Sequence, residues 1–285
     1  MNKLKLSLSM LIFGTIGIFV KYIPLPSSTV AMTRGYLGAL VLLIVMFVTG
    51  KKIDLQGIKK NLLKLVFSGA AIGINWILLF EAYNYTSVAV ATLSYYMQPV
   101  FLIILTPVLL KEKLSKKKVF CVPVALFGMV LVSGVFSSRQ DVGIKGVMLG
   151  LSAAVFYTAA VLINRTLKEI SAYDRTFIQL LVAALVITPY NSVVGFGDIS
   201  VLDVKAIIML LVVGFVHTGL TYFLYFSSVA SIQAESVAIF SYIDPATAIL
   251  LSVFFLGEPM TVSGVVGAVM ILGACMISEI EFKKK

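Results

Sequence analysis

Residues 73–118 read GINWILLFEAYNYTSVAVATLSYYMQPVFLIILTPVLLKEKLSKKK, two apolar runs followed by a cluster of lysines. Residues 219–264 read GLTYFLYFSSVASIQAESVAIFSYIDPATAILLSVFFLGEPMTVSG and align with them without a gap at a spacing of 146. The aligned pairs include Gly73 with Gly219, Trp76 with Tyr222, Phe80 with Phe226, Tyr96 with Tyr242, Pro99 with Pro245 and Glu112 with Glu258. The lysines that end the first copy become Gly257, Pro259, Val262, Ser263 and Gly264. A repeated unit that loses its positive charges in the second copy indicates a unit inverted in a membrane.

The composition of the whole chain also places it in a membrane. Of its 285 residues, 60% are hydrophobic and 13% are charged, against about 25% charged in soluble domains, and the mean hydropathy is +1.04. Apolar runs long enough to cross a bilayer as helices recur along the chain, whereas the alternating segments of a β-barrel do not. The net charge of +10 comes mainly from short loops between these runs, which indicates contact with anionic lipid rather than nucleic acid.

The apolar runs predict an all-α integral membrane protein with ten transmembrane helices and no soluble domain. We expect the helices at residues 4–22, 28–48, 61–83, 88–110, 118–136, 144–164, 176–194, 204–228, 234–256 and 261–280. The chain then divides into a first five-helix repeat, residues 1–138, and a second, inverted one, residues 144–285. The N-terminal run follows two lysines as a signal peptide would, but no clear cleavage site follows it, so we expect it to remain as the first helix.

The distribution of lysine and arginine sets the expected orientation. With the N-terminus in the cytoplasm, 18 of the 23 basic residues fall in cytoplasmic segments. The exceptions are Arg34, within a span, and Lys21, Arg139, Lys145 and Lys205, outside. By the positive-inside rule, both termini are therefore expected to be cytoplasmic. Because each repeat has an odd number of helices, the second must be inverted, and the loop at 195–203 accordingly carries acids where the loop at 50–60 carries lysines.

Inverted repeats are typical of secondary transporters, whose substrate site lies near the membrane midplane between the repeats. A membrane enzyme acting on lipid-linked substrates and a helical receptor or channel are the competing classes, but neither needs two equivalent gates. The sequence contains no nucleotide-binding Gly-Lys-Ser/Thr loop, a single histidine and no cluster of metal ligands. We therefore predict a protein that is not an enzyme and uses no cofactor.

Smaller motifs complete the pattern of the two halves. They are Arg34 early in the second helix, a proline near the middle of the fourth and ninth, and the turns Lys-Glu-Lys-Leu-Ser (111–115) and Gly-Glu-Pro-Met-Thr (257–261). Together with the ten helices, these motifs resemble the drug/metabolite transporter superfamily, EamA type, over nearly the whole chain. The resemblance implies a cavity bounded mainly by helices 1–4 and 6–9, with helices 5 and 10 at the periphery. It also implies alternating-access transport of small metabolites, which in this family include amino acids, sugars and nucleotide derivatives.

The polar residues at the centre of the fourth and ninth helices are the first candidates for function. Asp244 directly precedes Pro245, and a charge at mid-membrane costs about 2.5–3.5 kcal/mol on insertion scales. We interpret Asp244 as the counter-ion of a substrate amine or as a protonatable coupling group; a structural acid bonded between helices is the alternative. Gln98 has the equivalent place before Pro99. Both prolines predict kinks at which gates bend, with a polar backbone patch near Ser241.

A second group of candidates is aromatic and lies nearer the middle of the spans than their ends. Its members are Trp76, Tyr95, Tyr96, Tyr222 and Tyr242. They predict either a wall of amphipathic rings around an organic substrate or ordinary helix packing. Asn75, beside them, is interpreted as a substrate hydrogen-bonding residue or as a helix–helix contact.

Further polar residues have weaker signals. His217, the only histidine, is expected either to relay protons or to be a satisfied packing residue. Arg34 and Glu81 both fall in the outer thirds of their helices and are predicted to form a charge pair. Glu112 and Glu258 lie in turns that open helices, where carboxylates cap helix N-termini, and both are interpreted as structural.

The fifth and tenth helices carry small residues, including Gly128, Gly264, Gly267 and Ala268. Such residues permit close helix packing, and they predict either an internal contact or a homodimer face. The cysteines, Cys121 and Cys275, both fall inside spans and are expected to be packing residues.

Asp244 dominates the expected charge of the cavity. This favours zwitterionic or cationic substrates over phosphates, which would call for several arginines or lysines at mid-span. We therefore predict a multi-pass transporter of a bacterial cytoplasmic membrane that moves amino acids or related compounds, by export, with import by the same fold as the alternative. Proton coupling and facilitated transport both remain open. Its predicted partners are a small-molecule substrate and the lipid bilayer, without nucleic acid.

Overall fold

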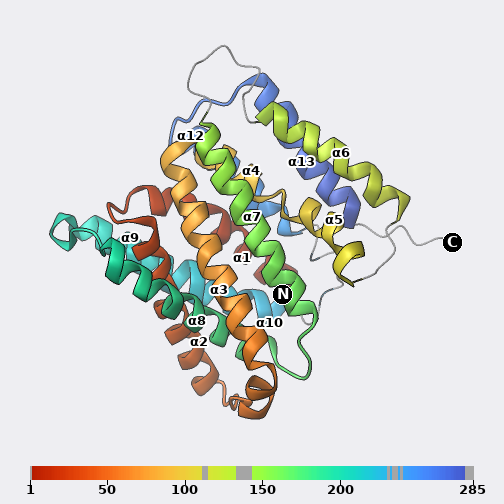
Figure 1. Ribbon diagram of the computed structural model, residues 1–285. Helices are drawn as coiled ribbons and strands as arrows, with labels where there is room; N and C mark the ends of the chain where they lie inside the picture. The colour runs from red at the N-terminus through yellow and green to blue at the C-terminus, as the bar shows by residue number, and fades with distance from the viewer. Residues whose placement is uncertain are drawn as a thin grey trace.

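The computed structural model describes residues 2–110, 115–132, 143–229, 232, 237 and 240–279, and the regular structure within them is entirely helical. The helices, shown in Figure 1, are α1 (Asn2–Lys21), α2 (Ser27–Val48), α3 (Leu55–Tyr85), α4 (Val88–Tyr95), α5 (Gln98–Leu110), α6 (Lys116–Val132), α7 (Ile144–Arg165), α8 (Ala172–Val194), η1 (Ile199–Val201), α9 (Val204–Gly214), η2 (Phe215–Leu220), α10 (Thr221–Val229), α12 (Ile243–Phe255) and α13 (Val262–Glu279). Glu112, Arg139 and the C-terminal lysines lie outside the described residues.

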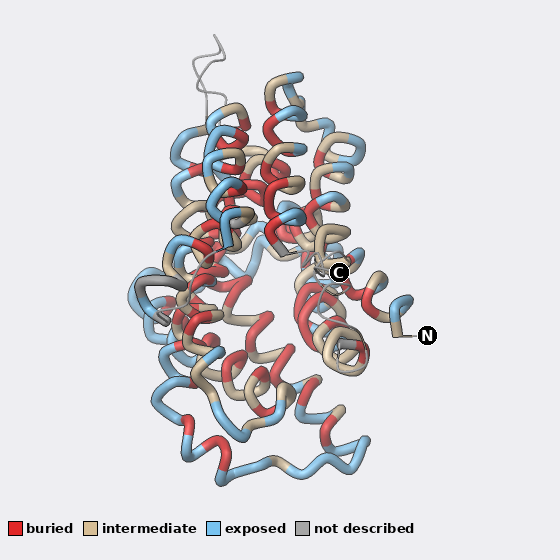
Figure 2. Tube along the Cα trace, turned by 90° about the vertical axis from the view of Figure 1, so that its right-hand side faces the viewer, coloured by how far each residue is buried: buried red, intermediate tan, exposed pale blue. Residues whose placement is uncertain are grey.

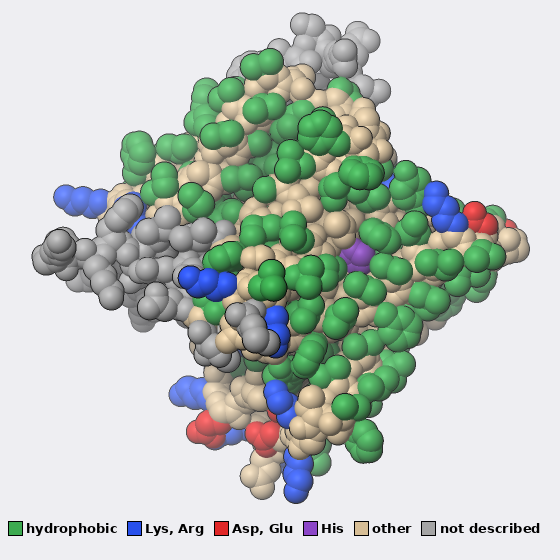
Figure 3. All heavy atoms as spheres, turned by 180° about the vertical axis from the view of Figure 1, so that it is seen from behind, with side chains coloured by type: hydrophobic (Ala, Val, Ile, Leu, Met, Phe, Trp, Pro, Cys, Tyr) green, Lys and Arg blue, Asp and Glu red, His purple; other side chains and the backbone are tan. Residues whose placement is uncertain are grey.

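Ten apolar helical segments in this part of the chain match the ten predicted spans. Seven of them are long and apolar enough to cross a membrane. Two of these seven combine consecutive helices: one joins α4 to α5, and the other joins α9, η2 and α10. Three shorter ones lie within α6, α12 and α13. Large apolar side chains cover much of the exterior, as a lipid-facing surface requires, while lysines and arginines gather toward its edges (Figure 3). The predicted all-α membrane fold is confirmed, while the side on which the termini lie stays a prediction.

Two helices begin earlier than predicted because side chains cap them. α3 starts at residue 55 rather than 61, since the Asp54 carboxylate accepts a hydrogen bond from the Gly57 amide at 2.9 Å. α8 starts at residue 172 rather than 176, since Ser171 Oγ accepts a hydrogen bond from the Asp174 amide at 3.1 Å and donates one to its carboxylate at 2.7 Å. Arg175, which the sequence places in a loop, therefore belongs to the first turn of α8.

The two predicted proline kinks are interruptions of helical structure. α4 gives way to α5 because Pro99 has no amide hydrogen to donate to the carbonyl of Tyr95. The equivalent break in the second repeat falls at Tyr242, which is not helical and directly precedes the helix α12 that contains Pro245. Each broken helix thus leaves polar backbone at the depth of its proline, which a membrane protein tolerates where that backbone lines a cavity.

The eighth predicted span contains a π-helical turn, η2, that the sequence did not reveal. In this turn Thr218 Oγ1 donates to the Val213 carbonyl at 2.9 Å, and Thr221 Oγ1 donates to the Val216 carbonyl at 2.7 Å. Both bonds span five residues, the spacing of a π-helix. The equivalent stretch of α3 is regular, so the turn is an asymmetry between the repeats.

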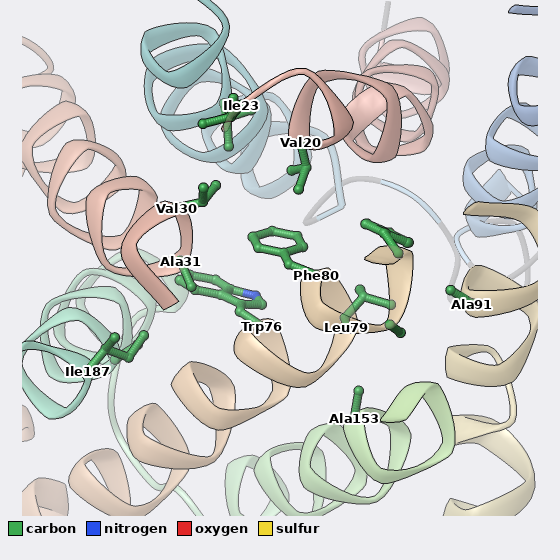
Figure 4. Packing of buried hydrophobic residues seen from close by; sticks show 14 of the residues in the cluster. Val20, Ile23, Val30, Ala31, Trp76, Leu79, Phe80, Ala91, Ala153 and Ile187 are labelled. Carbon is green, nitrogen blue, oxygen red and sulfur yellow. The ribbon is translucent and has the colours of Figure 1, made fainter. Parts of the chain in front are cut away.

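The core forms where α3 packs along α7 and α8, with α2 packed on α8 (Figure 1). Trp76 and Phe80 lie on successive turns of α3 and point toward Ala31 of α2 and Val20 of α1 (Figure 4). The buried residues face the middle of the helix assembly while the exposed ones face outward (Figure 2). This packing places α3 at the centre of the structure and its aromatic face beside α2.

α6 and α13 pack on each other at one side of the molecule (Figure 1). A Cβ atom on Gly128 would lie 2.8 Å from the Gly267 carbonyl oxygen, so the helices approach this closely only with glycine there. This crossing within the chain occupies Gly128 and Gly267, which is the internal contact given as one of the two interpretations of these small residues, while a homodimer through these helices stays a prediction. Cys121 and Cys275 are both buried and unbridged, and the Cys275 thiol donates a weak 3.7 Å hydrogen bond to the Tyr96 carbonyl freed near the α4–α5 break.

Candidate functional site

A cavity of about 770 Å³ lies between the two repeats. Its lining comes from α1 to α5 in the first repeat and from α7, α8, α10, residues 241–242 and α12 in the second. No described residue of α6 or α13 contributes. The volume is that of a small-molecule site.

Most of the predicted site residues line this cavity. They are Arg34, Asn75, Trp76, Tyr95, Tyr96, Gln98, Pro99, Tyr222, Ser241, Tyr242 and Asp244. Three predicted residues, His217, Glu81 and Pro245, are not part of the lining. The structure therefore brings together the repeat mates Trp76/Tyr222 and Tyr96/Tyr242, while their contact with substrate stays a prediction.

Asp244 is the only acid among the described residues of the lining, and it lies in the first turn of α12. The Tyr96 hydroxyl donates a hydrogen bond of 2.7 Å to Asp244 Oδ2. The Tyr95 ring lies edge-on to Tyr96, with centroids 5.8 Å apart, and 5.5 Å from the Tyr157 ring. A carboxylate among aromatic faces is an environment that attracts cations.

Arg34 provides positive charge elsewhere in the lining. Its guanidinium carbon lies 4.1 Å from the centroid of Trp76 and 5.3 Å from that of Phe80, and its Nε donates to Thr218 Oγ1 at 3.1 Å. The predicted charge pair with Glu81 is wrong, because no ion pair joins these two described residues. Arg34 and Glu81 were predicted to lie at a similar depth in the membrane, but their side chains do not face each other.

Glu81 has neutral partners instead of Arg34. Ser27 Oγ donates to Glu81 Oε2 at 2.8 Å, and Asn84 Nδ2 donates to the same oxygen at 3.3 Å. These contacts join α2 to the end of α3, so Glu81 is placed as a structural hydrogen-bond acceptor.

Three polar lining residues also make backbone contacts. Asn75 Nδ2 donates to the Ala153 carbonyl at 2.7 Å, so the amide joins α3 to α7, the helix–helix contact that was one of its two interpretations. The Gln98 carbonyl accepts from Thr158 Oγ1 at 3.3 Å, and Ser241 Oγ donates to a carbonyl one turn earlier at 2.8 Å. These contacts fix the side chains of Asn75 and Ser241 and the backbone of Gln98 at the cavity wall.

Several lining residues were not predicted from the sequence, among them Tyr157, Arg165 and Arg175. Tyr157 could have been found by extending the repeat, because Ser9, Phe13 and Thr15 recur as Ser152, Phe156 and Thr158 at a spacing of 143. This alignment pairs Tyr157 with Gly14, which also lines the cavity. The two arginines were counted as loop charges, although the Ser171 cap extends α8 over one of them.

A cluster of contacts around Glu258 joins the two repeats at one end of the structure. Lys21 Nζ at the end of α1 lies 3.0 Å from Glu258 Oε1, and the Val88 amide at the start of α4 donates to Oε2 at 2.8 Å. Ser252 Oγ also donates to Glu258 Oε2 and accepts from the Ala89 amide at 3.2 Å. Two side chains of the second repeat thus bind the N-terminus of a helix in the first.

This cluster corrects the expected role of Glu258. The carboxylate caps α4, a helix of the other repeat, while α13 is capped by Thr261 Oγ1, which accepts from the Gly264 amide at 3.1 Å. At the opposite end, the cavity extends to Arg165 and Arg175, where α7 ends and α8 begins. The two ends of the molecule therefore differ: the Glu258 cluster lies at one end, and the part of the cavity lined by the two arginines lies at the other.

His217 is buried between helices. Its Nε2 lies 2.7 Å from Thr15 Oγ1, its Nδ1 lies 3.3 Å from the Val212 carbonyl oxygen, and Phe19 packs edge-on against the ring at 4.8 Å. These contacts involve both ring nitrogens, and they agree with the interpretation of His217 as a satisfied packing residue.

The chain is similar to known proteins in both sequence and structure. A protein-family model described as the EamA-like transporter family matches the chain twice, over residues 4–134 and 144–279. The "Uncharacterized transporter YxxF" of Bacillus subtilis strain 168 is 29% identical over 278 residues, which cover 96% of this chain and 88% of that protein. An uncharacterized transporter of Archaeoglobus fulgidus is 26% identical over 271 residues, covering 95% and 93%. One solved crystal structure has the same fold, with a TM-score of 0.66, 15% identity, and coverage of 97% of this chain and 96% of its own.

Proposed function

The chain belongs to the EamA-like transporter family, as a multi-pass membrane transporter and not an enzyme. We propose that it exports small zwitterionic or cationic metabolites, amino acids or related compounds, by alternating access. The observation that carries this proposal is the pairing of Asp244 with Tyr96 inside an aromatic cavity between the repeats. An ammonium group would bind the carboxylate and rest against the rings of Tyr95 and Tyr157.

Alternating access requires a substrate site that opens to one side of the membrane at a time. The Lys21–Glu258 cluster closes one end, which the charge distribution assigns to the outside. The cavity extends to the other end, at Arg165 and Arg175, which the same rule assigns to the cytoplasm. In this proposal the structure represents the inward-facing state, and the breaks before Pro99 and Pro245 are the points at which the gating helices bend.

The proposal places the protein in a bacterial cytoplasmic membrane with both termini in the cytoplasm. A homodimer, if formed, would use the lipid-facing sides of α6 and α13, because Gly128 and Gly267 are taken up by the crossing between these helices. Protons are the coupling ions this site could use, since Asp244 is the only acid among the described lining residues.

Transport by the purified protein in liposomes tests the proposal. A panel of labelled amino acids would be measured for uptake and for counterflow, with and without a pH gradient, beside the Asp244→Asn variant. We expect wild-type protein to move at least one member and the variant to lose that activity. If no member of the panel moves, the substrate class is wrong. Efflux from loaded cells that express the protein distinguishes export from import, since an importer would raise rather than lower the internal pool.

A further inference from the structure

We infer that Arg34 is the binding site for the carboxylate group of the substrate, which is therefore a zwitterion rather than a simple amine. This inference rests on the proposed transport function and names the substrate class more closely. Arg34 is 5% exposed, yet it is one of the residues that line the cavity. It is a buried cation that borders the space a substrate would fill.

The protein itself does not neutralise this charge. A buried guanidinium is costly unless a counter-charge or hydrogen bonds compensate for the lost water. Within the described part of the chain, the ion pairs are Lys21–Glu258 and Lys60–Glu169, and neither involves Arg34. The Nε of Arg34 donates to Thr218, whereas its two terminal nitrogens have no hydrogen-bond partner among the described residues. These terminal nitrogens form the edge that a ligand can use.

The guanidinium is also held in a fixed orientation. Trp76 and Phe80 lie against it, at 4.1 Å and 5.3 Å from ring centroid to guanidinium carbon. Thr218 Oγ1 uses its own hydrogen to donate to the Val213 carbonyl, so it is left to accept from Arg34. The five-residue bond that orients this hydroxyl belongs to the π-helical turn η2. The turn thus acts as a positioning device for Arg34, in keeping with the frequent occurrence of π-turns at functional sites.

The remaining edge of an arginine matches a carboxylate, because its two parallel N–H groups bind both oxygens at once. A phosphate dianion at Arg34 is disfavoured by the Asp244 carboxylate of the same lining, and the other two arginines of the lining, Arg165 and Arg175, lie where α7 ends and α8 begins. Arg34 and Asp244 do not form an ion pair with each other, although both line the cavity. Among the charges of the lining, which also include Arg165 and Arg175, the acid Asp244 and the buried base Arg34 together match a ligand that carries both an ammonium and a carboxylate group.

The experiment uses a reporter already in the site. Trp76 is the only tryptophan in the chain and lies against Arg34, so its emission follows occupation of the guanidinium. Purified full-length protein would be titrated with phenylalanine, with phenylalanine amide and with phenethylamine, which share the ring and the ammonium but differ in the carboxylate. We expect phenylalanine to bind about tenfold or more tightly than the other two, as loss of a charged hydrogen bond predicts. Equal affinities for the three would overturn the inference, and this comparison needs no variant.

Variants then assign the preference to Arg34. Arg34→Gln should abolish the difference between phenylalanine and its amide, Arg34→Lys should keep part of it, and Thr218→Val should reduce it severalfold through misplacement of the guanidinium. The matched control is Lys145→Gln, which removes a cation 3.7 Å from the Tyr85 ring outside the cavity and should leave the preference unchanged. A wild-type preference in Arg34→Gln would assign the carboxylate elsewhere. Carboxylate-selective binding without amino-acid transport would contradict the proposed function alone, and transport without selectivity would contradict this inference alone.

Discussion

The hydroxyl of Tyr96 donates a 2.7 Å hydrogen bond to Asp244 Oδ2, so a single contact joins the two repeats at the cavity wall. Each of these residues lies beside the helix break that precedes its own repeat's proline. A substrate ammonium that reaches the carboxylate must share it with the phenol. Because the contact lies between two interrupted helices, we expect a change at one break to alter the geometry of the acid at the other.

The first prediction concerns the carboxylate itself. Asp244→Asn keeps the size of the side chain but removes the charge, so we expect affinity for an ammonium-bearing substrate to fall about ten- to a hundredfold. Tyr96→Phe, which keeps the charge and removes one hydrogen bond, should lower it only severalfold. Substrate-dependent uptake into liposomes measures both. Wild-type uptake by Asp244→Asn across a series of pH values would show that the acid is structural.

A second prediction concerns the crossing of α6 and α13. Gly128→Ala would place a Cβ 2.8 Å from the Gly267 carbonyl oxygen, so the helices must separate, at a cost of about 1–3 kcal/mol. Gly273→Ala, also on α13, is the matched control, because a Cβ there meets nothing within 4 Å. Thermal unfolding in detergent should show a lower midpoint for the first variant only. Equal midpoints would mean that the crossing adapts without cost.

The repeat predicted much of the cavity, because residues related by it lie at equivalent depths on equivalent helices. Trp76 and Tyr222 illustrate this, since both line the cavity although 146 residues separate them. The same reasoning failed for Arg34 and Glu81. Position along a helix gives depth in the membrane but not the neighbour that a side chain faces, and Arg34 faces the rings of α3.

Contacts between the repeats were the least predictable part of the site. The sequence predicts that Glu258 caps the helix that follows its own turn, yet its carboxylate accepts a hydrogen bond from the amide of Val88, 170 residues earlier. The π-turn that holds Thr218 has no recognised sequence signal, and it breaks the symmetry on which the prediction depended. The two halves of the cavity differ because the repeats are not identical. Gln98 in the first repeat corresponds to Asp244 in the second, and the regular helix α3 corresponds to a helix with the π-turn η2.

A third prediction separates the two interpretations of His217. Because its ring contacts Thr15 and the Val212 carbonyl and does not line the cavity, we expect a packing role. His217→Gln and Thr15→Val should both lower the unfolding temperature in detergent while uptake keeps its response to an imposed pH gradient. Loss of that response in a His217 variant with wild-type stability would instead identify a proton relay.

The fourth prediction concerns the closed end. Lys21 and Glu258 keep 32% and 15% of their side chains exposed, so their ion pair is partly shielded from water. Lys21→Met should weaken this closure and raise the outward-open population a few-fold. The reporter is Thr92→Cys, a cavity position in a protein whose own cysteines are buried, labelled by an impermeant thiol reagent from outside. The control, Lys60→Met, breaks the Lys60–Glu169 pair, whose side chains are 59% and 74% exposed, and should not change labelling. If both variants label at the wild-type rate, the Lys21–Glu258 pair does not act as a gate and only joins the helices.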